Sequence, residues 1–122
     1  MYYEVTTNLA LDGGIDGPEV SQPIELGTDN AILVQIAIVS GYVGSGSLVS
    51  TLEFSNDLDN WTDQSSYYQL TLSEAPSWGV LPSYQGADGR FRFARLRYLA
   101  TSSANVVFSG SLYTFHCGDQ AS

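Results

Sequence analysis

The stretch Ala31-Ile32-Leu33-Val34-Gln35-Ile36-Ala37-Ile38-Val39 decides the class of fold. It is rich in β-branched residues, which fit a pleated strand. In a strand over 31–40 one face carries Ile32, Val34, Ile36 and Ile38, and the other carries Leu33, Gln35, Ala37 and Val39. Both faces are largely apolar, which predicts a central strand whose second face is covered by a neighbour or a partner.

Similar short runs of Val, Ile, Thr, Tyr and Phe lie on both sides, separated by Gly, Asp, Asn, Pro and Ser. They predict strands near 2–8, 47–55, 66–72, 90–99 and 104–116, with a weaker candidate at 22–26. No window keeps a helical period between two caps. The sequence therefore predicts an all-β fold, a single antiparallel β-sandwich or jelly roll of about six to eight strands.

The 122 residues are enough for one domain with a real core. We expect an N-terminal strand or arm with a flexible loop at 1–17, a sandwich domain at 18–118 and a tail at 119–122. The segment 73–89 is expected to be the longest loop. The inward-facing residues predicted for the later strands are Leu52, Phe54, Val106, Phe108 and Leu112, with Thr51 and Glu53 facing outward. Gly110 is expected to mark a bulge.

Charge limits the partners. Thirteen acidic residues oppose four basic ones, for a net charge of −9. Such a surface repels phosphate backbones and anionic lipid, so we expect no nucleic-acid partner and no membrane attachment. The N-terminus does not read as a signal peptide, and the apolar stretch 31–43 is too short to span a bilayer. The single cysteine, Cys117, excludes an intrachain disulfide, and it is either unimportant or available for an intermolecular bridge.

Catalytic chemistry is poorly supplied. His116 is the one histidine, and it neighbours Cys117, so on a strand the two side chains point to opposite faces. We expect no enzymatic activity and no cofactor, and one His with one Cys makes zinc implausible. Calcium is a weak candidate at Asp57, Asp59 and Asp63, which alternate along a turn. The run Asp12–Gly17 is a second calcium candidate, and both segments also fit the role of turn formers.

The arginines Arg90, Arg92, Arg95 and Arg97 fall within eight residues. Their alternation with apolar residues changes register at Phe93-Ala94, so a bulge near Ala94 would place all four on one face. Two roles are open. They neutralise acids such as Glu53 across strands, or they bind carboxylates on another protein.

Aromatic residues lie in or beside the expected loops, namely Trp61, Tyr67, Tyr68, Trp78 and Tyr84. Trp61, Trp78 and Tyr84 could stack on sugars. This leaves two alternative functions open, a carbohydrate-binding module and a calcium-dependent adhesion domain.

Two segments resemble known β-sandwiches. Leu52–Trp61 is a strand ending in Ser, an Asp-rich turn and a Trp, and Arg92–Tyr98 is an aromatic followed by Arg-Leu-Arg. The pairing is similar to discoidin-like (galactose-binding-like) jelly rolls and to phage or virus structural proteins with related sandwiches. Together with the acidic, lysine-free and cysteine-poor composition and the N-terminal arm at 1–17, the resemblance favours a non-enzymatic virion component, such as a capsid decoration or a tail-associated protein. It would act as a homo-oligomer, binding itself or a capsid or tail protein, in the virion or in an extracellular setting.

The partner-binding residues expected for such a protein are Tyr2, Tyr3 and Val5 of the N-terminal arm, together with the four arginines. An arm of this kind adds a strand to a neighbour's sheet, so that main-chain hydrogen bonds provide the affinity.

Overall fold

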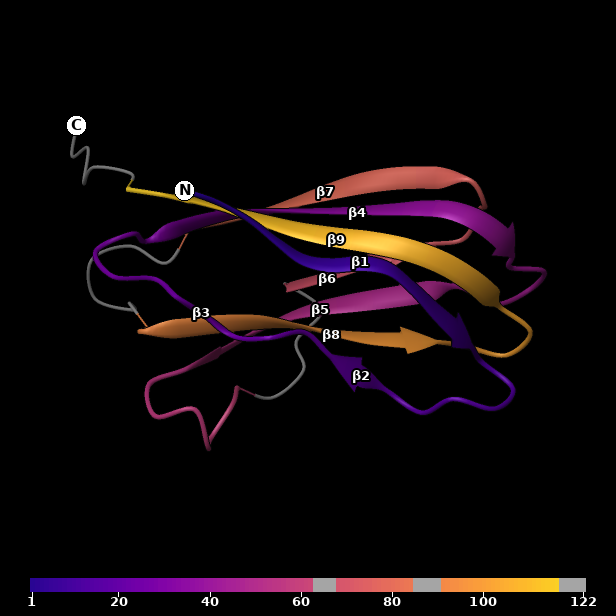
Figure 1. Ribbon diagram of the computed structural model, residues 1–122, viewed down its shortest axis with the longest axis horizontal. Helices are drawn as coiled ribbons and strands as arrows, with labels where there is room; N and C mark the ends of the chain where they lie inside the picture. The colour runs from indigo at the N-terminus through magenta and orange to yellow at the C-terminus, as the bar shows by residue number, and fades with distance from the viewer. Residues whose placement is uncertain (63–67, 85–90, 117–122) are drawn as a thin grey trace.

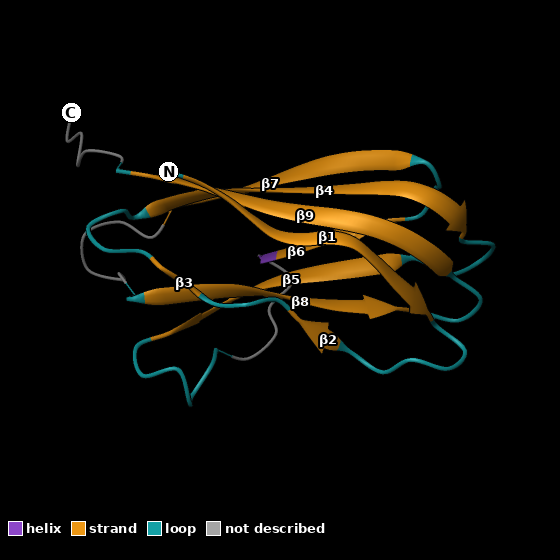
Figure 2. Cartoon of the chain, viewed as in Figure 1, coloured by secondary structure: helices purple, strands orange, loops and turns teal. Residues whose placement is uncertain are grey.

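The computed structural model describes residues 1–62, 68–84 and 91–116, with the side chains of Ser83 and Tyr84 left aside. Two antiparallel sheets lie one above the other, and loops join them at both ends (Figures 1 and 2). The strands are β1 (Tyr2–Asp12), β2 (Glu19–Val20), β3 (Ile24–Glu25), β4 (Ala31–Tyr42), β5 (Leu48–Ser55), β6 (Gln69–Leu72), β7 (Ser77–Tyr84), β8 (Phe93–Ala100) and β9 (Asn105–Phe115). The predicted all-β sandwich is confirmed.

The strand order is that of a jelly roll. One sheet runs β1-β9-β4-β7, and the other runs β2-β8-β5-β6. Strands β2 and β3 pair with successive parts of β8, so they act as two pieces of one interrupted strand. With these two pieces taken together the chain has eight strands in two four-stranded layers, which is jelly-roll topology.

The predicted core residues lie where the alternation puts them. In β4 the side chains of Ile32, Val34, Ile36 and Ile38 are almost fully buried between the sheets. Leu52 and Phe54 of β5 and Val106, Phe108 and Leu112 of β9 meet them from both layers. Strand β4 pairs with β9 on one side and β7 on the other, so its predicted central place is confirmed.

The prediction of a long loop over 73–89 is wrong, because β7 (Ser77–Tyr84) occupies half of it. Gly79 and Pro82 are unfavourable strand residues, so the alternation of Trp78, Val80 and Pro82 did not predict a strand. Proline cannot donate to a ladder and is tolerated on an edge strand, which is where β7 lies.

The prediction of a bulge near Ala94 is also wrong. Strand β8 pairs with β5 in unbroken register from Phe93 to Ala100. Arg95 and Arg97 therefore point outward, while Ala94 and Leu96 face the core. Arg92 avoids the core because it precedes the strand and is exposed.

Gly110 does face pairing irregularities, but β9 itself carries no extra residue there. The register of β1 against β9 shifts between Glu4 and Thr6 and again between Thr6 and Leu9, on either side of the Thr6–Gly110 pair. Both extra residues belong to β1, so the bulges are in the partner strand and not at Gly110 as predicted.

Residues 2–12 of the expected arm form β1, an edge strand that pairs with β9 of the same chain (Figure 1). The following turn is held by its own hydrogen bonds, among them those from the Asp12 amide to the Asp16 carboxylate and from the Gly14 amide to Asp12. Among the described residues, no helix has the length and apolar character needed to cross a membrane.

One polar contact joins the two sheets through the core. The Tyr98 side chain of β8 is fully buried and packs edge-on against Phe108, with ring centroids 4.7 Å apart. Its hydroxyl lies 2.6 Å from the Thr6 hydroxyl of β1 in the opposite sheet. A β-carbon at Gly110 would stand 2.7 Å from that Tyr98 oxygen, so the contact requires glycine at this position.

We therefore expect Gly110→Ala to destabilise the protein by about 1–3 kcal/mol, the usual cost of overpacking a core. The measurement is urea unfolding, with Gly17→Ala as control because a β-carbon there meets nothing within 4 Å. Adding Tyr98→Phe to Gly110→Ala removes the clashing oxygen, so the double variant should be more stable than the two single losses predict. Additive losses would contradict this account.

A second prediction concerns alkaline pH. Burial raises the pKa of Tyr98 to about 12, although the hydrogen bond with Thr6 lowers it. Because the folded-state pKa exceeds the ordinary value of 10.0, the native state holds this proton more tightly. That stabilisation is present below pH 10 and is lost as the pH rises from 10 towards 12. Thermal unfolding from pH 9 to 11.5 should show a steeper loss for the wild type than for Tyr98→Phe, and parallel curves would contradict it.

Candidate interaction surfaces

The outer side of the sheet β1-β9-β4-β7, which we call the outer face, is built of rows that cross the four strands. The ladder pairs place Tyr2, Tyr113, Leu33 and Pro82 in one row. The next row is Glu4, Ser111, Gln35 and Val80, and the third is Ser109, Ala37 and Trp78. The first row is wholly apolar or aromatic, and the third combines small side chains with a tryptophan.

Large apolar groups on this face are open to solvent. Trp78 is 67% exposed, Tyr2 62%, Tyr113 47% and Val80 43%. A single exposed hydrophobic residue is ordinary on a protein surface, but a contiguous apolar patch over four strands is typical of an interaction site. The sequence predicts that the second face of β4 is covered by a neighbour or a partner. That face belongs to the outer face, which the described part of this chain leaves exposed.

The outer face is hollowed beside Trp78. One shallow depression is lined by Tyr2, Glu4, Gln35, Ala37, Ser109, Gly110 and Ser111. A second, open depression shares Gln35 and Ala37 with it and reaches Pro76, Ser77 and Trp78. The small side chains of Ala37, Ser109 and Ser111 make the hollow, and the indole of Trp78 stands at its edge.

Charge is almost missing from these rows. Among the residues that form them, Glu4 on the edge strand β1 is the one charged side chain. The chain as a whole carries −9. The other acids of the described residues lie outside these rows, so the outer face is a nearly uncharged surface that a second acidic protein can approach at low electrostatic cost.

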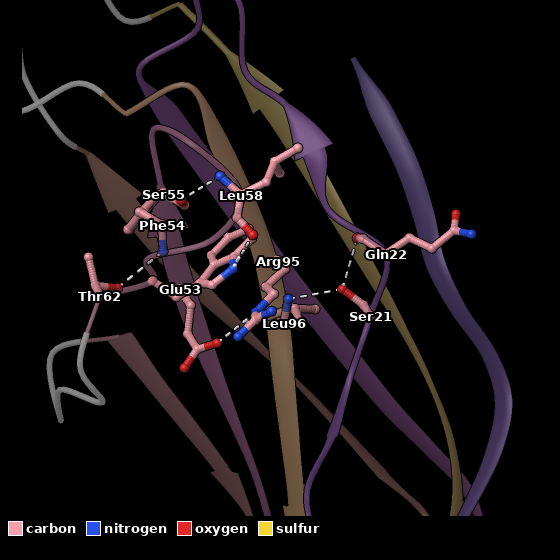
Figure 3. Close-up of polar contacts among 10 residues, drawn as sticks. Ser21, Gln22, Glu53, Phe54, Ser55, Leu58, Thr62, Arg95 and Leu96 are labelled. Carbon is pink, nitrogen blue, oxygen red and sulfur yellow. Dashed lines mark hydrogen bonds and ion pairs between the residues drawn. The ribbon is translucent and has the colours of Figure 1, made fainter.

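The other sheet carries a compact polar cluster on its outward side. Arg95 of β8 donates from Nε to Glu53 Oε1 of β5 at 2.9 Å, and Glu53 is nearly buried (Figure 3). The Trp61 ring lies over the same guanidinium, with 4.1 Å from Arg95 Cζ to the ring centroid. The sequence prediction that an arginine neutralises Glu53 across strands is confirmed for Arg95, whose charge is satisfied within the chain.

The turn after β5 holds Trp61 in place. The Ser55 hydroxyl accepts from the Leu58 amide (Figure 3), and the Trp61 indole donates to the Leu58 carbonyl. Asp57 accepts from the amides of Asp59 and Asn60 and from the Asn60 side chain. These bonds, with the Asn60 amide first, hold the pKa of Asp57 well below its usual range. Asp57 thus acts as a turn former.

The calcium candidates are not brought together in the part of the chain that is described. Both Asp57 oxygens accept hydrogen bonds inside the turn, and Asp63 lies outside the described residues. No group of three His, Cys, Asp or Glu side chains converges among residues 1–62, 68–84 and 91–116. Cys117 is also outside them, and the ring of its neighbour His116 contacts the Thr28 carbonyl.

The expected sugar platform is wrong as a single site. Trp78 is on β7 of one sheet, whereas Trp61 bridges to Ser55 of the other and stacks on Arg95. These two rings lie on opposite sides of the sandwich, and the Tyr84 side chain is not described.

The predicted partner-binding residues separate into three groups. Tyr2 lies on the outer face, whereas Tyr3 and Val5 pack against the core. Arg92 stacks on Phe93 at 5.3 Å, and Arg95 and Arg97 point outward from β8. Arg90 lies outside the described residues. The sequence reading missed Trp78 and Val80 as parts of a sheet face, and the alternation around Gly79 was the signal.

No family model matches the chain, and no curated protein matches its sequence. Among solved structures, it is similar to the chain in "Bacillus endospore appendages form a novel family of disulfide-linked pili", with a TM-score of 0.54 and 9% identity over 97% of this chain and 88% of that one. The infectious bursal disease virus Gx strain structure gives 0.52 and 14% over 98% of this chain, but only 33% of that chain. The SPBc2 prophage-derived protein YomS gives 0.48 and 10%, with 92% of each chain covered.

At these identities the first two similarities establish the fold and nothing finer. They support the jelly-roll part of the resemblance seen in the sequence, and the discoidin-like part stays a prediction.

The Glu53–Arg95–Trp61 cluster yields a prediction on stability. Glu53→Gln keeps the side-chain volume but removes the charge that Arg95 faces, so we expect a loss of about 1–2 kcal/mol, since a charge-assisted hydrogen bond becomes a neutral one. Urea unfolding measures it, with exposed Glu19→Gln of β2 as the control. Equal stabilities of the two variants would show that the ion pair contributes nothing measurable.

Proposed function

We propose that the protein is a non-enzymatic structural component of a virion, a capsid decoration or a tail-associated protein, that acts through protein–protein contacts. The observation that carries this proposal is the exposed apolar outer face of the sheet β1-β9-β4-β7. An uncharged row of Tyr2, Tyr113, Leu33 and Pro82 crossing four strands has the composition of an interface core, which is depleted in charge and enriched in aromatics.

The fold supports the same role by analogy. Jelly rolls occur in viral capsid and lectin domains. The similar chains belong to structures of Bacillus endospore appendage pili and of infectious bursal disease virus, which are protein assemblies. Because folds host many functions, this analogy adds to the argument from the outer face and does not replace it. A location in the virion, or an extracellular one, fits both the exposed outer face and the fold analogy.

The N-terminal strand offers a second means of assembly within this proposal. Strand β1 lies at a sheet edge and is followed by the Gly-rich turn over 12–18. The Met1 amino group bonds to the Thr114 carbonyl, so β1 is tied to β9 along its length. The same ladder formed with β9 of a neighbouring copy would exchange the strand without new contacts.

The test of this function is the composition of particles. Phage or virus-like particles induced from cells that carry the gene are purified on a density gradient, with a photo-crosslinking residue at position 80 or, as control, at exposed position 15. We expect the protein in the particles at a fixed copy number and crosslinks from position 80 only. Absence from the particles, or equal crosslinking from both positions, would overturn the proposal.

A further inference from the structure

We infer that the occupant of the outer face is a second copy of this chain, and that the two copies stack face to face around a two-fold axis parallel to the strands. This inference rests on the proposed function, because it names the partner of the same surface. It follows from the shape, the charge and the register of the outer face.

Shape is the first argument. An isologous interface uses the same patch on both copies, so that patch must carry both a projection and a recess. The outer face has the exposed Trp78 indole on β7 and a hollow over Ala37, Ser109 and Ser111 that reaches β1. A large aromatic entering a recess of small residues is the usual form of an interface anchor.

Register is the second argument. A two-fold axis parallel to the strands and between β9 and β4 keeps each row at its own height and reverses the strand order. Strand β7 of one copy then lies over β1 of the other, which brings Trp78 to the edge of the hollow beside Ser109, the β9 member of its own row. The aromatic row of Tyr2, Tyr113, Leu33 and Pro82 meets itself, and aligned sheets stack at about 10 Å.

Charge is the third argument. In this arrangement Glu4 of one copy lies opposite Val80 of the other, because the two residues end the same row on opposite edges. The two Glu4 carboxylates are therefore kept apart. The remaining acids of the described residues lie outside the rows, so these faces of two acidic chains can meet at low electrostatic cost.

Area is sufficient. Four strands about 4.8 Å apart and eight paired residues long cover roughly 500 Å² as a flat surface. Side-chain relief raises the accessible area towards the roughly 800 Å² per partner of a standard interface.

The experiment is sedimentation velocity of the full chain over a wide concentration range. We expect a dimer whose dissociation constant rises roughly thirty-fold in Trp78→Ala, the effect of losing an anchor residue. Ile15→Ala, at an even more exposed apolar position in the turn after β1, should dimerise like the wild type. Added salt should strengthen the dimer, because it screens the repulsion between two acidic chains.

A charge pair tests the arrangement itself. In Val80→Glu the new carboxylate faces Glu4 of the other copy, so this variant should abolish the dimer. Val80→Lys, at the same exposed position, should keep the dimer. The double variant Val80→Glu with Glu4→Lys should dimerise again. Thermal melting checks that each variant is folded. A chain that is monomeric at every concentration, or equal loss in Val80→Glu and Val80→Lys, overturns the inference.

The two failures are distinguishable. A chain that is monomeric alone but present in particles removes the dimer and leaves the structural function. A dimer with these charge effects from a chain that is absent from every particle removes the virion role and leaves the dimer.

Discussion

The rest of the structure depends on one contact between the two sheets, which the buried Tyr98 side chain makes. Its hydroxyl meets Thr6 of β1 and passes above Gly110 of β9, so one buried group fixes the position of three strands. A buried hydroxyl without a partner would cost free energy, and Thr6 removes that cost. The two bulges in β1 flank Thr6, and they set the register that pairs it with Gly110.

The same alternation that builds the core also builds the outer face. Because successive side chains of a strand point to opposite sides, Ile32, Val34 and Ile36 can enter the core only if Leu33, Gln35 and Ala37 face outward. On the outward side of the other sheet the turn over 55–62 covers Arg95, with the Trp61 ring stacked on its guanidinium. In the described residues no such segment covers the outer face. Its apolar residues are therefore available to the surface of another molecule.

Much of this fold could be predicted from the sequence, because local alternation is strong in β4, β5 and β9. The core sides of these strands were predicted correctly for Ile36, Phe54 and Phe108. Strand β7 was not predicted, since Gly79 and Pro82 are poor strand residues that outweighed the alternation of Trp78, Val80 and Pro82 and that an edge position explains. The sequence analysis placed Trp61 and Trp78 in one group of loop aromatics. Their separation along the chain does not show that they belong to different sheets.

Charge distribution completes the physical account of this surface. Glu53 can be nearly buried because Arg95 neutralises it and the Trp61 ring lies over the guanidinium, so this acid is used inside the chain. Asp57 is used in its own turn, as Asp12 and Asp16 are in theirs. Apart from Glu4, the acids of the described residues lie in or beside loops and on the β5–β8 sheet, away from the rows of the outer face. A strongly acidic chain keeps its solubility by this arrangement, while one nearly neutral face remains able to approach another protein.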